Sequence, residues 1–182
     1  MSPPIVRLGH PVLRFPAAPV DLERLRVGDH TELMETMKGT LSSLGADSLA
    51  APQMGAELQI LVFRGGVLDE VGAGTKPKIV LNPMLEPEHG DLVYDWEACL
   101  SIPDLKGLVP RYPSVRLRGL DEEGELIDVM AKGRRARILQ HAHDHLGGVV
   151  YLDRMGDLRS LAFGDEWRRF LRGSDSPDRE QP

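Results

Sequence analysis

The stretch Arg134–Gly148, RRARILQHAHDHLGG, decides the fold, because it combines helical periodicity with side chains that can do chemistry. Gly133 precedes it and two glycines end it, which predicts a helix over Arg134–Leu146. At about 100° per residue, one face of this helix carries Ile138, His141, Ala142 and His145. Two histidines at i and i+4 can bind one metal ion from adjacent turns, although packing or surface roles explain such a pair about equally well.

Other candidate ligands lie outside this pair. Cys99, within Trp96–Ser101 (WEACLS), is the single cysteine of the chain, so no intrachain disulfide can form. A lone cysteine is more often a small buried hydrophobe, but a reducing cytoplasm would keep it available as a thiolate ligand. Asp144 follows His141 closely, and we expect it to fix the tautomer of a ligand histidine. Ser48–Gln53 (SLAAPQ) taken alone predicts a tight loop with a hydrogen-bonded glutamine.

Three motifs in the same order resemble those of the peptide deformylase family. That family carries Gly-x-Gly-Leu-Ala-Ala-x-Gln, Glu-Gly-Cys-Leu-Ser and Gln-His-Glu-x-Asp-His. This chain has ADSLAAPQ at 46–53, EACLS at 97–101 and QHAHDH at 140–145. The likeness extends over residues 5–155, and it implies an α+β fold with mainly antiparallel β-sheets around a central metal-binding helix.

The resemblance implies a specific chemistry. The family removes the formyl group from N-formylmethionyl peptides with one divalent ion, usually Fe²⁺, while Zn²⁺, Ni²⁺ or Co²⁺ are possible. The ligands here would be Cys99, His141 and His145, which leaves a coordination position open. Gln53 and the backbone N–H of Leu100 would stabilise the oxyanion.

The resemblance also implies a substrate site and a structural pair. Ser48, Leu49 and Ile138 would contact the substrate, whose methionine side chain enters an apolar pocket in the family. Glu97 and Arg111 match positions that form a buried pair, without a role in catalysis.

The chain departs from the family pattern at the catalytic centre. Ala142 stands where the family has its catalytic glutamate, and general acid–base catalysis contributes about 10²–10⁴-fold. Ala46, Ser48 and Ala98 replace glycines, so their Cβ atoms would crowd the site and a special φ would be lost. Lys106 replaces an arginine near the substrate entrance.

These departures leave two classes of function open. The first is a metal-dependent deformylase-type hydrolase with impaired or specialised activity. The second is a catalytically inactive protein that binds metal and peptide. Retained ligands together with a missing general base are consistent with both classes.

The rest of the chain predicts one domain over residues 1–172 and a disordered tail over 173–182. Residues 1–20 hold five prolines and predict an extended arm. The further predictions are a helix capped by Asp29 and ended by Gly45, a hairpin loop over 64–77, a helix near Asp165–Leu171, and strands at 58–63, 78–82, 115–120, 125–129 and 149–152. Pro83 is expected to end the strand at 78–82.

Composition and sequence pattern argue against several classes of protein. The 182 residues carry a net charge of −6, so a dedicated nucleic-acid binder is not expected. The basic group Lys132, Arg134, Arg135 and Arg137 is interpreted as a solvated helix start. No apolar run is long enough for a membrane span and no signal peptide is recognisable, so we expect a cytoplasmic protein of unknown oligomeric state.

Overall fold

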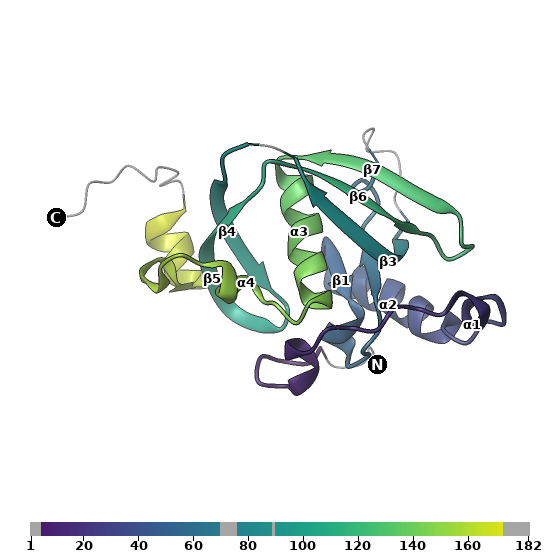
Figure 1. The fold of residues 1–182 in the computed structure, drawn as a ribbon. Coiled ribbons are helices and arrows are strands. Elements are labelled where there is room, and N and C mark those ends of the chain that lie inside the picture. Colours follow the sequence, from purple (N-terminus) through teal and green to yellow (C-terminus); the bar gives the residue numbers. More distant parts are fainter. Residues whose placement is uncertain (1–4, 70–75, 89, 173–182) are drawn as a thin grey trace.

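The computed structural model describes residues 5–69, 76–88 and 90–172. Its architecture is α+β with antiparallel sheets, as predicted, and helix α3 (Arg134–Leu146) lies between the two sheets (Figure 1). The larger sheet has the order β1-β2-β3-β6-β7, formed by Ser48–Ala50, Ile60–Phe63, Lys78–Pro87, Ser114–Leu120 and Leu126–Lys132. The smaller sheet has the order β4-β5-β8, formed by Val93–Cys99, Ile102–Arg111 and Ala162–Phe163.

The predicted bounds of α3 are confirmed, and one of its faces is buried against the larger sheet. The apolar cluster between them includes Leu61, Phe63, Val80, Leu117, Ala136, Leu139, Ala142 and Leu146. Each fully buried leucine or phenylalanine stabilises the fold by about 1.5–3 kcal/mol. This packing fixes the rotation of α3 and therefore the direction in which its histidines point.

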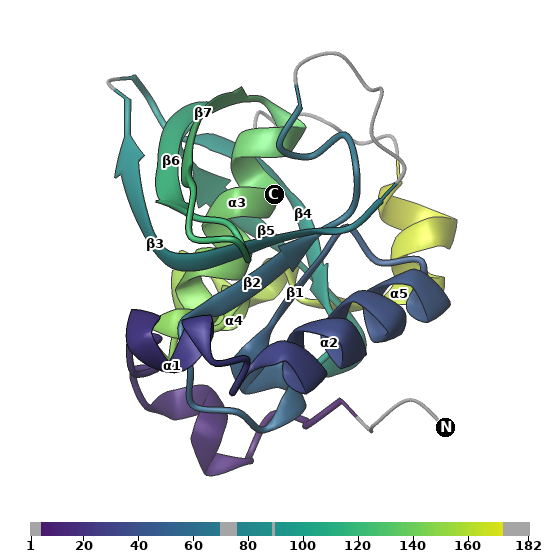
Figure 2. The same ribbon diagram turned by 90° about the vertical axis from the view of Figure 1, so that its right-hand side faces the viewer.

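Helix α2 (Thr31–Leu44) covers the other face of the same sheet (Figure 2). Met34, Met37 and Leu41 are buried there, as their helical spacing predicts. Gly45 ends the helix with φ 61°, a left-handed conformation that glycine adopts without strain. The prediction that Asp29 caps this helix is wrong: Asp29 accepts a hydrogen bond from Arg24 Nε at 2.8 Å instead.

The positions of prolines explain two differences between the predicted strands and those in the structure. Strand β3 does not stop at Pro83, because a bulge between Leu81 and Met84 carries the chain past it. Gly119 packs against this bulge, where an added Cβ would lie 2.9 Å from the carbonyl oxygen of Leu81. Strands β4 and β5 were not predicted, and β5 contains two prolines. They are tolerated because β8 pairs with β5 only at Leu105 and Lys106, so neither proline nitrogen is needed for that pairing.

The hairpin of β6 and β7 is confirmed, whereas the predicted strand at 149–152 is wrong. Residues Tyr151–Arg154 form a short helix, α4, because Asp153 accepts a hydrogen bond from the Val150 N–H at 2.8 Å and caps its first turn. The predicted helix near 165–171 exists as α5 (Gly164–Glu166) and a π-helical turn (Trp167–Leu171).

The N-terminal arm is extended apart from a 3-10 turn at Pro11–Arg14. It crosses the body of the protein, with backbone N–H groups of Val6, Leu8 and Ala17 bonded to distant carbonyls. The remaining short helices are α1 (Leu22–Arg26) and 3-10 turns at Ala51–Met54 and Leu158–Ser160.

Strands β2 and β3 pair across the predicted hairpin loop, of which residues 70–75 lie outside the described residues, as does the predicted tail at 173–182. In the described ranges, no helix combines the length and the apolar character needed to cross a membrane.

Candidate metal centre

Three donor side chains meet at the end of β4 and on the inner face of α3. Cys99 is the last residue of β4, and His141 and His145 lie one turn apart on α3. Their ligand atoms all lie within 4.8 Å of one another, and Cys99 Sγ is 3.3 Å from His145 Nε2. The sequence predicted this set, and the fold brings it together from segments about 40 residues apart.

The donor set fits a divalent ion. A tetrahedral ion about 2.3 Å from sulfur and about 2.0 Å from nitrogen would hold those two atoms about 3.5 Å apart, close to the distance found here. The Nδ1 atom of His141 is 2.8 Å from Glu97 Oε2, which leaves its Nε2 for the cluster. Burial raises the pKa of Cys99, but hydrogen bonds with His141 and His145 outweigh it and lower that pKa to about 5. The thiolate, the form that binds metals, is therefore favoured.

A buried network of charges lies behind the cluster. Glu97 forms a two-pronged ion pair with Arg111, at 2.9 and 3.0 Å, and both side chains are 4% exposed. Arg111 also forms an ion pair with Asp144 at 2.5 Å, and Asp144 accepts a hydrogen bond from Arg154 at 2.7 Å. Burial raises the pKa of Glu97, but hydrogen bonds from His141 and Arg111 prevail and lower it to about 2. The expected pairing of Glu97 with Arg111 is confirmed.

The expected role of Asp144 is wrong. Its carboxylate is occupied by two arginines, whereas Glu97 makes the hydrogen bond that orients His141. Although Asp144 is only three positions beyond His141, its carboxylate is directed toward Arg111 on β5 and Arg154 on α4. Glu97 reaches the ring from the neighbouring strand.

The interpretation of the basic group as a solvated helix start is wrong for Arg137. Its side chain is 11% exposed and donates to Glu97 at 2.9 Å. It also donates to the carbonyls of Val93 at 2.6 Å and Val109 at 2.7 Å. Arg137 therefore ties α3 to both β4 and β5 at the back of the site.

Gln53 and Leu100 lie beside the donor cluster. The Gln53 side chain is buried; its Oε1 accepts from the Ala50 N–H at 3.0 Å. This bond directs the Nε2 group toward Cys99 Sγ, at 3.5 Å, and Ser101 Oγ, at 3.4 Å. Leu100 follows Cys99 and lines the same pocket as Gln53. Their roles in oxyanion stabilisation stay predictions.

Ala142 is 1% exposed and packs in the apolar cluster between α3 and the larger sheet. It lies between the two ligand histidines in sequence, and its methyl group brings no group that can exchange a proton. None of Ala46, Ser48 and Ala98 has a positive φ, since the described non-glycine residues with positive φ are Asn82 and Asp104. The loss of a special φ relative to the family's glycines stays a prediction. Ala46, Ser48 and Ala98 do line the pocket, so their Cβ atoms occupy part of its wall.

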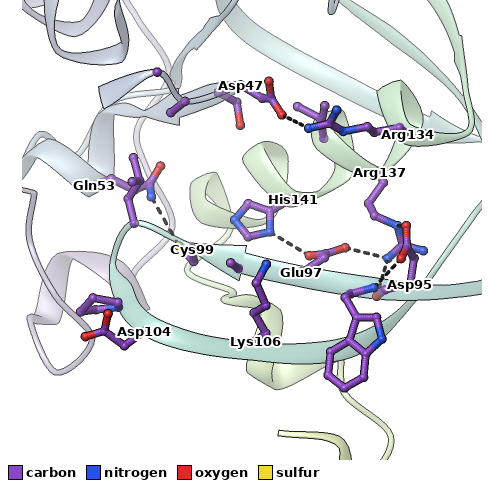
Figure 3. Close-up of a pocket in the computed structure, with 18 residues that line it drawn as sticks. Asp47, Gln53, Asp95, Glu97, Cys99, Asp104, Lys106, Arg134, Arg137 and His141 are labelled. Carbon is purple, nitrogen blue, oxygen red and sulfur yellow. Dashed lines mark hydrogen bonds and ion pairs between the residues drawn. The ribbon is translucent and has the colours of Figure 1, made fainter. Parts of the chain in front are cut away.

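A pocket of about 560 Å³ opens beside the donor cluster (Figure 3). Ser48 and Ile138 line it as predicted, but Leu49 is fully buried in the cluster under α2 and is not part of the wall. The expected pocket is not purely apolar, because its lining also includes charged side chains: Asp47, Asp95, Glu97, Asp104, Lys106, Arg134 and Arg137. The sequence placed Lys106 near the substrate entrance and Glu97 in a buried pair. It did not reveal the other five, because they come from β4, β5, α3 and the turn before β1, and each resembles an ordinary surface charge.

Tyr151 is a further residue that the sequence did not reveal. Its ring stacks on His141 with centroids 6.3 Å apart and an interplanar angle of 22°. Burial, with the nearby charges of Cys99 and Glu97, raises the pKa of Tyr151 to about 12, so its phenol stays protonated. Tyr151 is not among the residues that line the pocket, so it contacts His141 from within the fold.

The motifs, the fold and the donor cluster agree with known proteins. Residues 2–160 match the family model described as polypeptide deformylase. The chain belongs to this family. Peptide deformylase 1 of Nitrosomonas europaea is 36% identical over 175 residues, which cover 91% of this chain and 94% of that protein. The Cys-His-His set is thus the metal site of a deformylase-family protein.

Solved deformylases have the same fold. A peptide deformylase from Synechococcus elongatus in complex with actinonin is 34% identical, with a TM-score of 0.75 over 87% of this chain and 82% of that one. A class I type b peptide deformylase from Acinetobacter baumannii, bound to Met-Ala-Ser, is 27% identical. Its TM-score is 0.74 over 85% of this chain and 100% of that one.

Proposed function

We propose that this protein hydrolyses N-formyl amides at the amino terminus of peptides or related small substrates, at a rate limited by Ala142. The observation that carries the proposal is the buried Cys-His-His cluster at the wall of a pocket large enough for a small ligand. Family membership supports the same reaction. Water would add to the formyl carbon, the C–N bond would break, and formate and a free amine would leave.

Cys99, His141 and His145 would hold the divalent ion, with Fe²⁺ first among Fe²⁺, Zn²⁺, Ni²⁺ and Co²⁺. When bound, such an ion supplies Lewis-acid polarisation of a carbonyl oxygen and makes water more acidic. Glu97 would orient His141, since its carboxylate accepts the Nδ1 proton and leaves Nε2 as the ligand. Gln53 and the Leu100 N–H would donate to the oxygen that gains charge at the formyl group.

Proton transfer is the weak step of this proposal. The reaction needs a group that takes a proton from water and returns it to the departing amine, and Ala142 has none. A loss of about 10²–10⁴-fold is the usual consequence of removing such a group. The proposed substrate contacts are Ser48, Leu49 and Ile138. Leu49 is buried below the pocket surface, so its contribution would be to support the wall rather than to touch the substrate directly.

The test is formate release from an N-formylmethionyl peptide by protein loaded with iron, nickel or zinc. We expect about one divalent ion per chain by elemental analysis, and slow formate release that depends on it. Cys99→Ser should lose the ion or hold it weakly, with Ser101→Ala as a matched control beside the site. A protein that contains no metal, refuses all three ions and releases no formate would contradict the proposal.

Ala142 also supports a second candidate, a protein that binds metal and formylated peptide without hydrolysis. It predicts tight binding of metal and peptide, with no formate released even by Ala142→Glu. Turnover by the unmodified, metal-loaded protein excludes it.

A further inference from the structure

The pocket beside the donor cluster is lined by charged side chains as well as apolar ones. Seven of its eighteen lining residues are charged, and its large apolar side chains are limited to Trp96, Leu100 and Ile138. A thioether chain gains free energy from apolar contact, but it offers no strong acceptor to a charged donor that has no ion-pair partner. A polar substrate side chain is therefore the better match.

Most of these charges already have partners. Asp47 accepts from both Arg64, at 2.5 Å, and Arg134, at 2.7 Å, so two cations share one carboxylate. Glu97 is held by Arg111, Arg137 and His141. The carboxylates of the inner wall are thus used, and the unused hydrogen-bonding capacity there belongs to donors.

Lys106 is the main unused donor. It extends from β5 into the pocket, toward His141 (Figure 3), and it makes no ion pair with any residue in the described ranges. Its Nζ lies 4.4 Å from the ring centroid of Trp167, a contact that satisfies none of its three N–H donors in the manner of a carboxylate. Burial lowers the pKa of Lys106, and the nearby charges of Arg168 and Arg172 lower it further, while the charge of Asp95 raises it. The lowering causes prevail, and an anion beside this ammonium would offset them.

The charge around the cluster favours an anion as well. A divalent ion held by one thiolate and two neutral imidazoles leaves a net positive charge at this wall. Ala142 supplies no carboxylate to offset it. Asp95 and Asp104 also line the pocket, but both are exposed, so water already solvates them.

We propose that this pocket selects N-formylated substrates whose first side chain carries a carboxylate, such as N-formylglutamyl peptides, which Lys106 binds in place of a methionine side chain. The inference rests on the proposed function, because it names the substrate class of the same site. A charge-assisted hydrogen bond contributes about 1.5–3 kcal/mol, which corresponds to a preference of about 10–100-fold.

Binding can be measured without relying on turnover. The chain has two tryptophans: Trp96 lines the pocket and Trp167 contacts Lys106, so their fluorescence should report an occupied pocket. Stopped-flow titration of the metal-loaded protein would compare formyl-Glu-Ala-Ser with formyl-Met-Ala-Ser before hydrolysis begins. We expect the acidic peptide to bind at least about 10-fold more tightly, which is the lower end of the range above.

Lys106→Met should remove most of this preference, because it keeps the length of the side chain and loses the charge. Lys106→Arg should retain it, and Lys132→Met, on exposed β7 away from the pocket, should leave it unchanged. Equal or tighter binding of the methionyl peptide, an unchanged preference in Lys106→Met, or no binding of either peptide would each overturn the inference.

Formate release separates this inference from the proposed function. Hydrolysis of both peptides without a binding preference would overturn the inference and leave the function standing. A strong preference for the acidic peptide without hydrolysis of any formylated peptide would support the pocket assignment and contradict the hydrolase.

Discussion

Two sets of ion pairs flank the donor cluster, and they differ in burial. Behind the cluster, Glu97, Arg111 and Asp144 have side chains that are 4–8% exposed and hydrogen-bonded to one another. At the pocket rim, Arg134 is 77% exposed and shares Asp47 with Arg64. Removing one partner of a buried pair leaves the other charge without a partner and without solvent. When an exposed pair is broken, water solvates the remaining charge, so the loss of stability is small. The buried set therefore fixes geometry, and the rim remains free to respond to a ligand.

Arg111→Met tests the buried set and should have the largest effect. It leaves the carboxylates of Glu97 and Asp144 without their shared cation, which should lower the free energy of unfolding by about 3–5 kcal/mol. Urea denaturation of the metal-free protein measures the change. Arg116→Met, which breaks the partly exposed pair with Asp128 on β6 and β7, is the control and should change stability little. Equal costs would show that burial does not distinguish the two kinds of pair.

Glu97→Gln tests the same set through pH. The folded pKa of Glu97 is lowered from 4.5 to about 2, so its ionised form should stabilise the fold by about 3 kcal/mol at neutral pH. Because the shift is downward, this contribution is fully present above pH 4.5 and is lost as the pH falls toward 2. The difference in stability between the protein and Glu97→Gln should shrink over that interval. Glu86→Gln, in an exposed pair with Arg118, should show little such dependence.

Ala142→Glu tests whether the missing carboxylate limits the reaction, at a residue that lies between the apolar cluster and the donor cluster. A carboxylate there can exchange a proton with water at the site, so kcat/KM on a formylated peptide should rise by about 10²-fold or more. The pH–rate profile should gain a limb that reports the new carboxyl group, since its ionised form accepts the proton. Stability should fall, because Ala142 lies in an apolar cluster where a carboxylate is desolvated.

Metal content must be equal in the two forms for this comparison. Ala142→Gln is the matched control, because it has the same size and cannot transfer the proton. If Glu and Gln give the same rate as Ala at equal occupancy, the missing carboxylate is not the limiting defect. The crowding by Ala46, Ser48 and Ala98 would then be the next explanation.

Arg134→Gln tests the rim and should have the smallest effect on stability. The side chain of Arg134 is exposed and its partner Asp47 keeps Arg64, so the cost should be about 0–1 kcal/mol. Thermal unfolding at low and high salt would measure it. A loss as large as that of Arg111→Met would mean that the rim is part of the structural network.

Much of the site was visible in the sequence because its signals are local. The glycines around α3 and the spacing of His141 and His145 predict the helix and two ligands without knowledge of any other segment. The family motifs add Cys99 and Gln53 to the same site. The predicted partner of His141 was wrong, since a residue near in sequence was chosen over Glu97, which is 44 positions away.

The sequence by itself determined the α+β class, the central helix, the donor residues and the absence of a glutamate at position 142. The tertiary structure decided which carboxylate orients His141, how β3 passes Pro83 and why the pocket is charged. Helical periodicity is fixed by neighbouring residues, so one segment is enough to read it. Strand register and the meeting of Asp47, Lys106 and Arg134 around one pocket depend on packing between distant segments, and no local pattern encodes that packing.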